Sequence, residues 1–262
     1  MIHRCLLAIG ILFTSAFFAT AESSWANLPV IASPVFKADT FNVTDFGAVP
    51  DGITLNSNAI NKAIKKCSAA GGGVVLVPAG LWLSGPIELQ SHVNLHLASG
   101  AVLLFTSDFN QYPLVEGTYE GRRSARNQSP LHGKDLENVA ITGKGIVDGN
   151  GDAWRMVGKD RLTEREWQAK LASGGLVSSD GKTWFPSAKT KLAFDTKRSA
   201  TLAAGQSLSD FADIKDYLRP NLLVLYNCKK VLLEGVSFQN SPAWCLHPVL
   251  CEDLTVRNVF AK

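Results

Sequence analysis

Two carboxylates, Asp148 and Asp152, occur in IVDGNGDAW, a stretch with the Gly and Asn content of a turn. Paired carboxylates are suited to general acid–base chemistry, and by position these two are the best candidates in the chain. However, nothing in the sequence supplies a second carboxylate at the separation that acid–base catalysis needs. We therefore favour a structural role for Asp148, which is expected to organise the turn through Asx hydrogen bonds, and we assign no catalytic residue.

Trp244 and His247 occur together in SPAWCLHP, a stretch that we interpret as one strand. An indole and an imidazole along one strand are able to stack on a sugar or to hydrogen-bond to it, so this pair is the candidate substrate-binding site. The alternative is that both side chains pack in the fold with their polar atoms satisfied there.

Arg122, Arg123 and Arg126 form a small basic cluster that is able to attract an anion, although an exposed, solvated loop explains it equally simply. No Cys and His spacing is typical of a metal site, and we expect neither a metal nor a cofactor. The net charge of +3 over 262 residues gives no electrostatic reason to expect a nucleic-acid partner.

The first residues have the pattern of an export signal. MIHR is a short basic region, CLLAIGILFTSAFFA is apolar, and Ala19-Thr20-Ala21 is a small-residue cleavage site, so residues 1–21 are predicted to be a signal peptide. The alternative is an uncleaved anchor, but the apolar run is short for a span. We expect a secreted or periplasmic protein with no membrane partner after cleavage.

Residues 22–40 are polar and rich in proline, as in a lead-in segment, and 41–48 form a short strand. Apolar residues then recur with helical spacing through NSNAINKAIKKC, which predicts an amphipathic helix over 57–67 that ends at GGG (71–73). Most later segments are rich in Val and Leu with a period of two, and few turn signals join them as hairpins.

A repeat organises these strands. CKKVLLEGVSFQN, which begins at Cys228, aligns with CEDLTVRNVFAK at an offset of 23 residues, so that Val231 matches Leu254 and Leu233 matches Val256. LENVAITGKGIVDG fits the same template. This period favours an all-β parallel β-helix whose coils stack about 4.8 Å apart, rather than an antiparallel sandwich. Cys228 and Cys251 should then lie one above the other, either as a disulfide or as reduced, buried thiols.

Residues from about 152 to 220 interrupt the repeat and are predicted to leave the coil stack. They either form a lid or one wall of a cleft, or they are a solvated surface loop.

Three stretches together resemble glycoside hydrolase family 28, the polygalacturonases and related pectin hydrolases. They are the run from FNVTDFGAVPDG to ASGAVL, then ITGKGIVDGNGDAW, and then VLLEGVSFQNSPAWCLHPVLCEDLTVRNV. The resemblance implies a single-stranded right-handed parallel β-helix over 41–262, with an N-terminal α-helix that caps the open end. It also implies inverting hydrolysis of pectic galacturonan or rhamnogalacturonan by a monomeric enzyme.

The residues that the resemblance would assign to catalysis are missing. The family has an Asn-Thr-Asp motif, an Asp-Asp pair, a Gly-His-Gly motif and an Arg-Ile-Lys motif, and none of these occurs in the 262 residues. We therefore expect the chain to be an N-terminal part of such a hydrolase and to be inactive alone. The alternatives are a non-catalytic carbohydrate-binding β-helix and a β-helical polysaccharide lyase.

Overall fold

The computed structural model describes residues 28–262, so the predicted signal peptide lies outside the described residues. The chain separates into two units, Met1–Val30 and Ile31–Lys262, and the description below concerns the second. Between residues 28 and 262, no helix is both long enough and apolar enough to cross a membrane.

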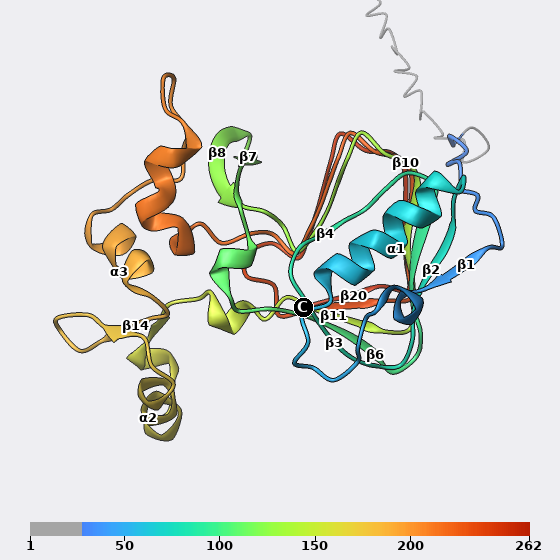
Figure 1. Cartoon of the computed structure of the whole chain (residues 1–262). Coiled ribbons are helices and arrows are strands. Elements are labelled where there is room, and N and C mark those ends of the chain that lie inside the picture. Colours follow the sequence, from blue (N-terminus) through green and yellow to red (C-terminus); the bar gives the residue numbers. More distant parts are fainter. Residues whose placement is uncertain (1–27) are drawn as a thin grey trace, which may run out of the picture. The chain divides into compact units, whose positions relative to one another are not determined.

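Three sheets of parallel strands form the body of the fold (Figure 1). The first sheet contains, in spatial order, β1 (Thr40–Asn42), β2 (Gly73–Val77), β5 (Val93–Leu97), β10 (Glu137–Gly143), β16 (Lys229–Glu234) and β19 (Glu252–Arg257). The second contains β3 (Gly80–Ser84), β6 (Ala101–Phe105), β11 (Ile146–Asp148), β17 (Ser237–Gln239) and β20 (Phe260–Ala261). The third contains β4 (Ile87–Glu88), β9 (Leu131–Lys134), β15 (Leu223–Tyr226) and β18 (Leu246–Val249). The chain visits the sheets in turn, so each coil adds one rung to the stack.

The register of the strands agrees with the repeat. Val231 pairs with Leu254 and Leu233 with Val256, at the predicted offset, and both pairs are parallel. On the preceding coil Val139 pairs with Val231. The right-handed parallel β-helix predicted from the sequence is confirmed, and the antiparallel sandwich is wrong.

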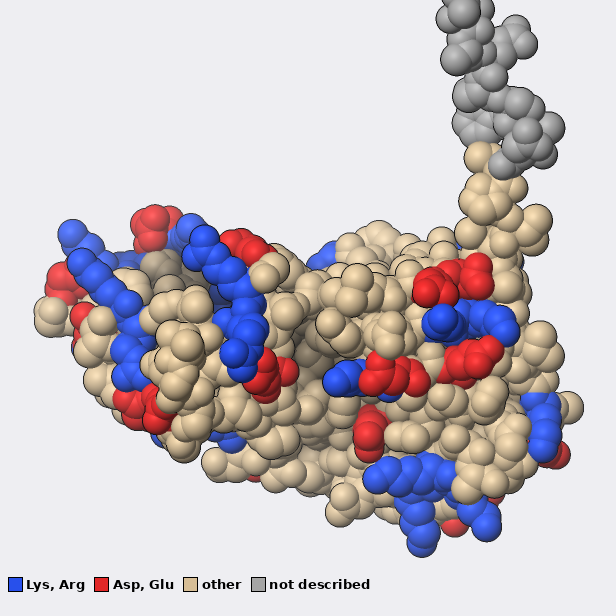
Figure 2. Space-filling model, turned by 90° about the horizontal axis from the view of Figure 1, so that it is seen from above, with Lys and Arg blue, Asp and Glu red and all other residues tan. Residues whose placement is uncertain are grey.

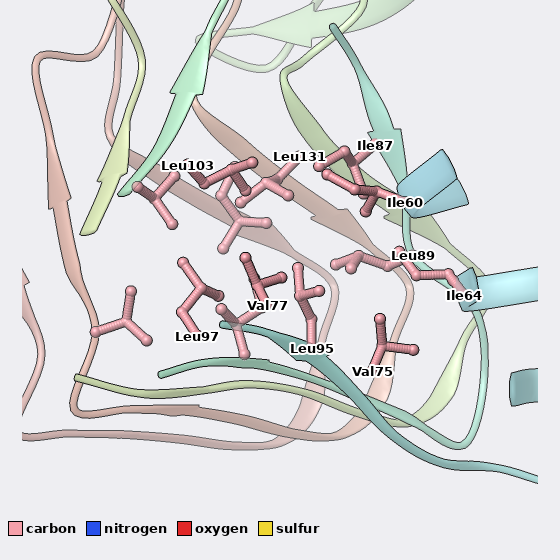
Figure 3. Close-up of a cluster of buried hydrophobic side chains, with 14 of the residues drawn as sticks. Ile60, Ile64, Val75, Val77, Ile87, Leu89, Leu95, Leu97, Leu103 and Leu131 are labelled. Atoms are coloured by element: carbon pink, nitrogen blue, oxygen red, sulfur yellow. The ribbon is translucent and has the colours of Figure 1, made fainter. Parts of the chain in front are cut away.

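Alternate residues of each strand point into the coil stack and make one continuous apolar core. β2, β5 and β6 each bury their first, third and fifth residues. Figure 3 shows Val75, Val77, Leu95 and Leu97 from neighbouring rungs gathered in this core. Because identical strand positions lie one above another, a period of two in the sequence becomes a column of buried side chains.

Helix α1 (Ser57–Ala69) covers the end of the stack near β1 and β2, as the predicted capping helix should. Ile60 and Ile64 are fully buried and point into the same cluster as the strand residues (Figure 3). The helix gives apolar cover to an end that would otherwise expose unpaired strands.

The corners that follow β9, β15 and β18 repeat the same left-handed conformation. Asp135, Asn227 and Leu250 have φ of 56°, 52° and 54°. Asn227 Nδ2 donates a hydrogen bond of 2.6 Å to Asp135 Oδ1, which ties one corner to the next. Asp and Asn adopt this conformation more readily than Leu does, and two of the three corners have such a short polar side chain.

The cysteines of the described residues are free thiols, so the reduced alternative holds for Cys228 and Cys251. Cys228 is buried, and Cys251 is half-buried one rung away. Burial raises the pKa of the Cys228 thiol, which therefore behaves as a small apolar side chain at neutral pH.

Two segments leave the stack. The first is an antiparallel hairpin of β7 (Leu114–Tyr119) and β8 (Arg122–Asn127), which the sequence analysis treated as an exposed loop. The second lies between β11 and β15 and is called the insert below. Its elements are η4 (Gly151–Ala153), β12 (Val157–Gly158), η5 (Lys159–Arg161), α2 (Glu164–Ala172), β13 (Leu176–Val177), β14 (Thr183–Phe185), α3 (Ala188–Asp195) and η6 (Leu208–Tyr217). Two short 3-10 helices, η2 (Val43–Phe46) and η3 (Phe109–Gln111), complete the fold.

The hairpin and the insert share a second apolar cluster, separate from the coil core. Ala125 of β8 packs there with Ala193 of α3 and with Phe211 and Ile214 of η6, all of them buried. The part of the insert from α3 to η6 is therefore packed against the hairpin.

Inward-facing and outward-facing residues of one strand should contribute differently to the free energy of unfolding. Leu233 of β16 is 1% exposed, whereas Leu232 beside it faces outward and is half-buried. Leu233→Ala should lower the free energy of unfolding by about 2–5 kcal/mol, because it leaves a cavity in the core. The matched change Leu232→Ala should cost clearly less, as measured by chemical denaturation. Equal losses for the two variants would contradict the assignment of faces.

Candidate functional site

The outer face of the third sheet forms the floor of a groove. The register aligns Glu88, His132, Val224 and His247 in one outward column across its four strands. The groove has a volume of about 580 Å³, and its facing wall is the hairpin β7–β8. The floor is rigid, because the backbone hydrogen bonds of the stack fix each of its strands.

His247 lines this groove, and Trp244 lies beside it in the lining of a second cleft. His247 is part of β18, whereas Trp244 lies in the bend before it, so their assignment to one strand is wrong for Trp244. Their ring centroids are 5.1 Å apart, and Tyr119 of the hairpin stacks on Trp244 at 5.0 Å and 18°. Trp244 remains 39% exposed, so the indole offers a surface to a ligand as well as to its neighbours.

Arg126 joins this aromatic cluster. Its guanidinium carbon lies 4.8 Å from the centre of the Tyr119 ring, a cation–π contact that fixes its position. Arg126 lines the groove on one side and a second cleft on the other.

His247 is held neutral in this setting. Burial lowers its pKa below the ordinary value, and the positive charge of Arg126 lowers the pKa further. Its Nδ1 atom is buried and has no hydrogen-bond partner among the described residues.

The second cleft, the arginine cleft, has a volume of about 720 Å³ and lies between the hairpin and the insert. It is lined by Arg122, Arg126, Arg155, Arg161, Arg198 and Arg219. Glu120 is the one acidic residue in its lining within the described chain.

Strand β8 contributes to this cleft with alternate residues. Arg122, Ser124 and Arg126 line it, whereas Arg123 points the other way and forms an ion pair with Glu116. The alternation in RRSARN was the signal in the sequence that could have identified a strand with one basic face. The arginines of the insert carry no such periodic signal, and sequence reasoning missed them.

The two aspartates do not take part in either cavity. Asp148 Oδ1 accepts a hydrogen bond of 2.8 Å from the backbone N–H of Asn150, the Asx interaction predicted from the sequence. Its Oδ2 accepts one of 2.9 Å from Gln239 Nε2. Asp152 pairs with Arg155 at 2.6 Å. Within residues 28–262 no group of His, Cys, Asp and Glu has the arrangement of a metal site.

The charge of Arg126 should be visible in the titration of His247. Replacing it in Arg126→Met keeps most of the apolar stem but removes the charge, so the pKa of His247 should rise toward its ordinary value. NMR titration of the imidazole measures this directly. Arg123→Met is the control, because Arg123 is already neutralised by Glu116, and a rise of equal size there would contradict the assignment.

Comparison with known proteins agrees with this architecture. Residues 40–200 match the family described as "Rhamnogalacturonase A/epimerase, pectate lyase-like". A probable polygalacturonase of Vitis vinifera is 28% identical over 232 residues, which cover 85% of this chain and 37% of that protein. An exo-poly-alpha-D-galacturonosidase of Dickeya chrysanthemi is 36% identical over 148 residues, which cover 53% and 24% of the two chains.

Among solved structures, a hyperthermoactive exopolygalacturonase from Thermotoga maritima superposes with a TM-score of 0.63 at 30% identity, over 88% of this chain and 48% of that one. The chain thus spans less than half the length of each of these three relatives. The matched family covers more than half of the chain, and the relatives agree with the motifs noted in the sequence. The chain belongs to the rhamnogalacturonase A/epimerase, pectate lyase-like family and is a polygalacturonase-like member of glycoside hydrolase family 28.

Proposed function

We propose that this chain binds the galacturonan backbone of pectic polysaccharide in the groove over the third sheet, as part of a secreted, monomeric polygalacturonase-type glycosidase. The names of its relatives, a polygalacturonase and an exo-poly-alpha-D-galacturonosidase, support the substrate class. The observation that carries the proposal is the exposed indole of Trp244 beside the unpartnered His247 and the guanidinium of Arg126.

Each of these groups suits one part of an acidic sugar. A pyranose ring has an apolar face that stacks on the half-exposed indole of Trp244. The Arg126 guanidinium is able to donate two parallel hydrogen bonds to a uronate carboxylate. The half-buried imidazole of His247, which lines the groove, adds a polar ring for a sugar hydroxyl.

Cleavage of the glycosidic bond requires groups other than these three. Inverting hydrolysis requires a carboxylic acid and a carboxylate about 6.5–9.5 Å apart, with room for a water molecule between them. Asp148 is committed to its turn and to Gln239, and Asp152 to Arg155. We therefore assign substrate binding, and no catalytic group, to residues 28–262.

The expected behaviour of the 262-residue chain is binding to polygalacturonate without release of reducing ends. Trp244→Ala should weaken that binding about tenfold, because it removes the stacking surface. Affinity electrophoresis measures the binding, and a reducing-sugar assay measures the cleavage.

Leu250→Ala is the matched control, since Leu250 is 67% exposed on the same coil and lines neither cavity. Equal weakening by both substitutions, or no binding of polygalacturonate by the unmodified chain, would overturn the proposal. Release of reducing ends would refute the assignment of binding alone.

A further inference from the structure

The arginine cleft has far more positive charge than the fold itself neutralises. Six arginines and one glutamate line it. Figure 2 shows Lys and Arg side chains, with acidic side chains among them, on the left of the molecule, the side on which the insert lies in Figure 1. A cavity of about 720 Å³ falls in the range of pockets that hold small molecules.

Two of the six arginines are held by acidic residues. Arg155 pairs with Asp152, and Arg198 pairs with Asp213 at 3.1 Å. These two ion pairs join parts of the wall, and the acidic partners largely compensate the charge of Arg155 and Arg198.

The other four are not compensated within the described chain. The side chain of Arg219 donates one hydrogen bond of 3.1 Å, from Nη1 to the carbonyl oxygen of Pro242. The side chains of Arg122, Arg126 and Arg161 form no hydrogen bond and no ion pair with residues 28–262. Burial lowers the pKa of Arg126, Tyr119 opposes this effect, and the positive charge of Arg219 lowers the pKa further. Several arginines that line one cleft with a single acidic residue among them favour an anion as the missing partner.

An independent sign of a ligand comes from two buried donors in the same lining. Ser124 is 2% exposed and Trp154 is 1% exposed, yet neither Ser124 Oγ nor Trp154 Nε1 has a hydrogen-bond partner in the described chain. The Trp154 ring is fixed by edge contacts with Phe109 and Tyr112, at 4.5 and 5.1 Å between centroids. Buried polar groups are nearly always satisfied, so these two donors indicate an acceptor that enters the cleft.

We infer that the arginine cleft binds the carboxylates of consecutive uronic acid residues, as a continuation of the groove past Arg126 and Trp244. Both residues line the cleft, and Arg126 also lines the groove, so one saccharide is able to occupy both cavities. Arg122, Arg161 and Arg219 then supply the ligands for the carboxylates, and Ser124 and Trp154 donate to oxygen atoms of the same sugars. The inference rests on the proposed function and adds the residues that select charged, unesterified saccharides.

The test uses calorimetric titration of the full chain with trigalacturonate and with the neutral galactotriose. Arg122→Gln, Arg161→Gln and Arg219→Gln should each weaken trigalacturonate binding about tenfold, the usual cost of a lost hydrogen bond to a charged group. The variant with all three substitutions should bind trigalacturonate more than about a hundredfold more weakly than the unmodified chain. The affinity of Arg219→Lys for trigalacturonate should lie between those of the unmodified chain and Arg219→Gln. Lysine keeps the positive charge but lacks the planar guanidinium group.

Arg165→Gln is the matched control, because Arg165 is an exposed arginine of α2 that lines neither cavity. Galactotriose should bind at least about a hundredfold more weakly than trigalacturonate, since it has no carboxylates to fill the cleft. Thermal unfolding of each variant reports whether the fold is intact. If the triple variant is unstable, the binding data of the single variants decide the test.

Three results would overturn the inference. If the arginine variants bind trigalacturonate as tightly as the unmodified chain while His247→Ala, a change in the groove alone, weakens it, the cleft assignment is wrong and the groove proposal stands. If galactotriose binds as tightly as trigalacturonate, carboxylate recognition is wrong. If the unmodified chain binds no galacturonate at all, both the cleft and the groove proposals fail.

Discussion

The structure depends on one constraint, the in-register parallel pairing of each coil with the next. Once Val231 lies beside Leu254, every other position of the two coils is set, because backbone hydrogen bonds join each strand to the equivalent strand one rung away. Inward positions become the apolar core, outward positions become columns on the surface, and corner positions share one conformation. Val139 and Val231 pair although they are 92 residues apart, whereas the next coil advances by 23. The insert is therefore looped out of a single turn without disturbing the stack.

The location of the insert explains the site. The hairpin, the insert and the SPAW bend all lie on the connection from the second sheet to the third, on three successive coils. Stacking brings these connections together, so Arg122 and Arg126, Arg161 and Arg219, and finally Trp244 gather along one edge of the third sheet. The second apolar cluster, built around Ala125 and Phe211, holds the two walls against each other. The residues proposed to bind the ligand therefore lie mainly in connections that extend from the regular coil stack.

The sequence predicted most of what periodicity controls. The offset of 23 residues, the inward columns, the capping helix and the Asx turn of Asp148 all follow from local pattern, and the structure confirms them. The hairpin was missed because its turn is Glu120-Gly121, with φ of 50° and 76°, instead of the Asn-Gly that usually marks such turns. The arginine cleft could not be predicted, because its residues come from Arg122 to Arg219 and meet only through the second cluster. Trp244 and His247 were found as a pair, whereas their neighbours Tyr119 and Arg126 come from a hairpin that no pairing signal connected to them.

Disulfide trapping of engineered cysteine pairs tests the stacking most directly. Glu234 and Arg257 are register partners on the outer face of the first sheet, so the variant Glu234→Cys with Arg257→Cys should form a cross-link on mild oxidation, which peptide mapping by mass spectrometry identifies. The pair Glu234→Cys with Thr255→Cys is displaced by two residues along the strand, beyond the range that a disulfide bridges, and should stay reduced. Cross-linking of the displaced pair in preference to the matched one would contradict the register, and with it the arrangement of the groove and the cleft.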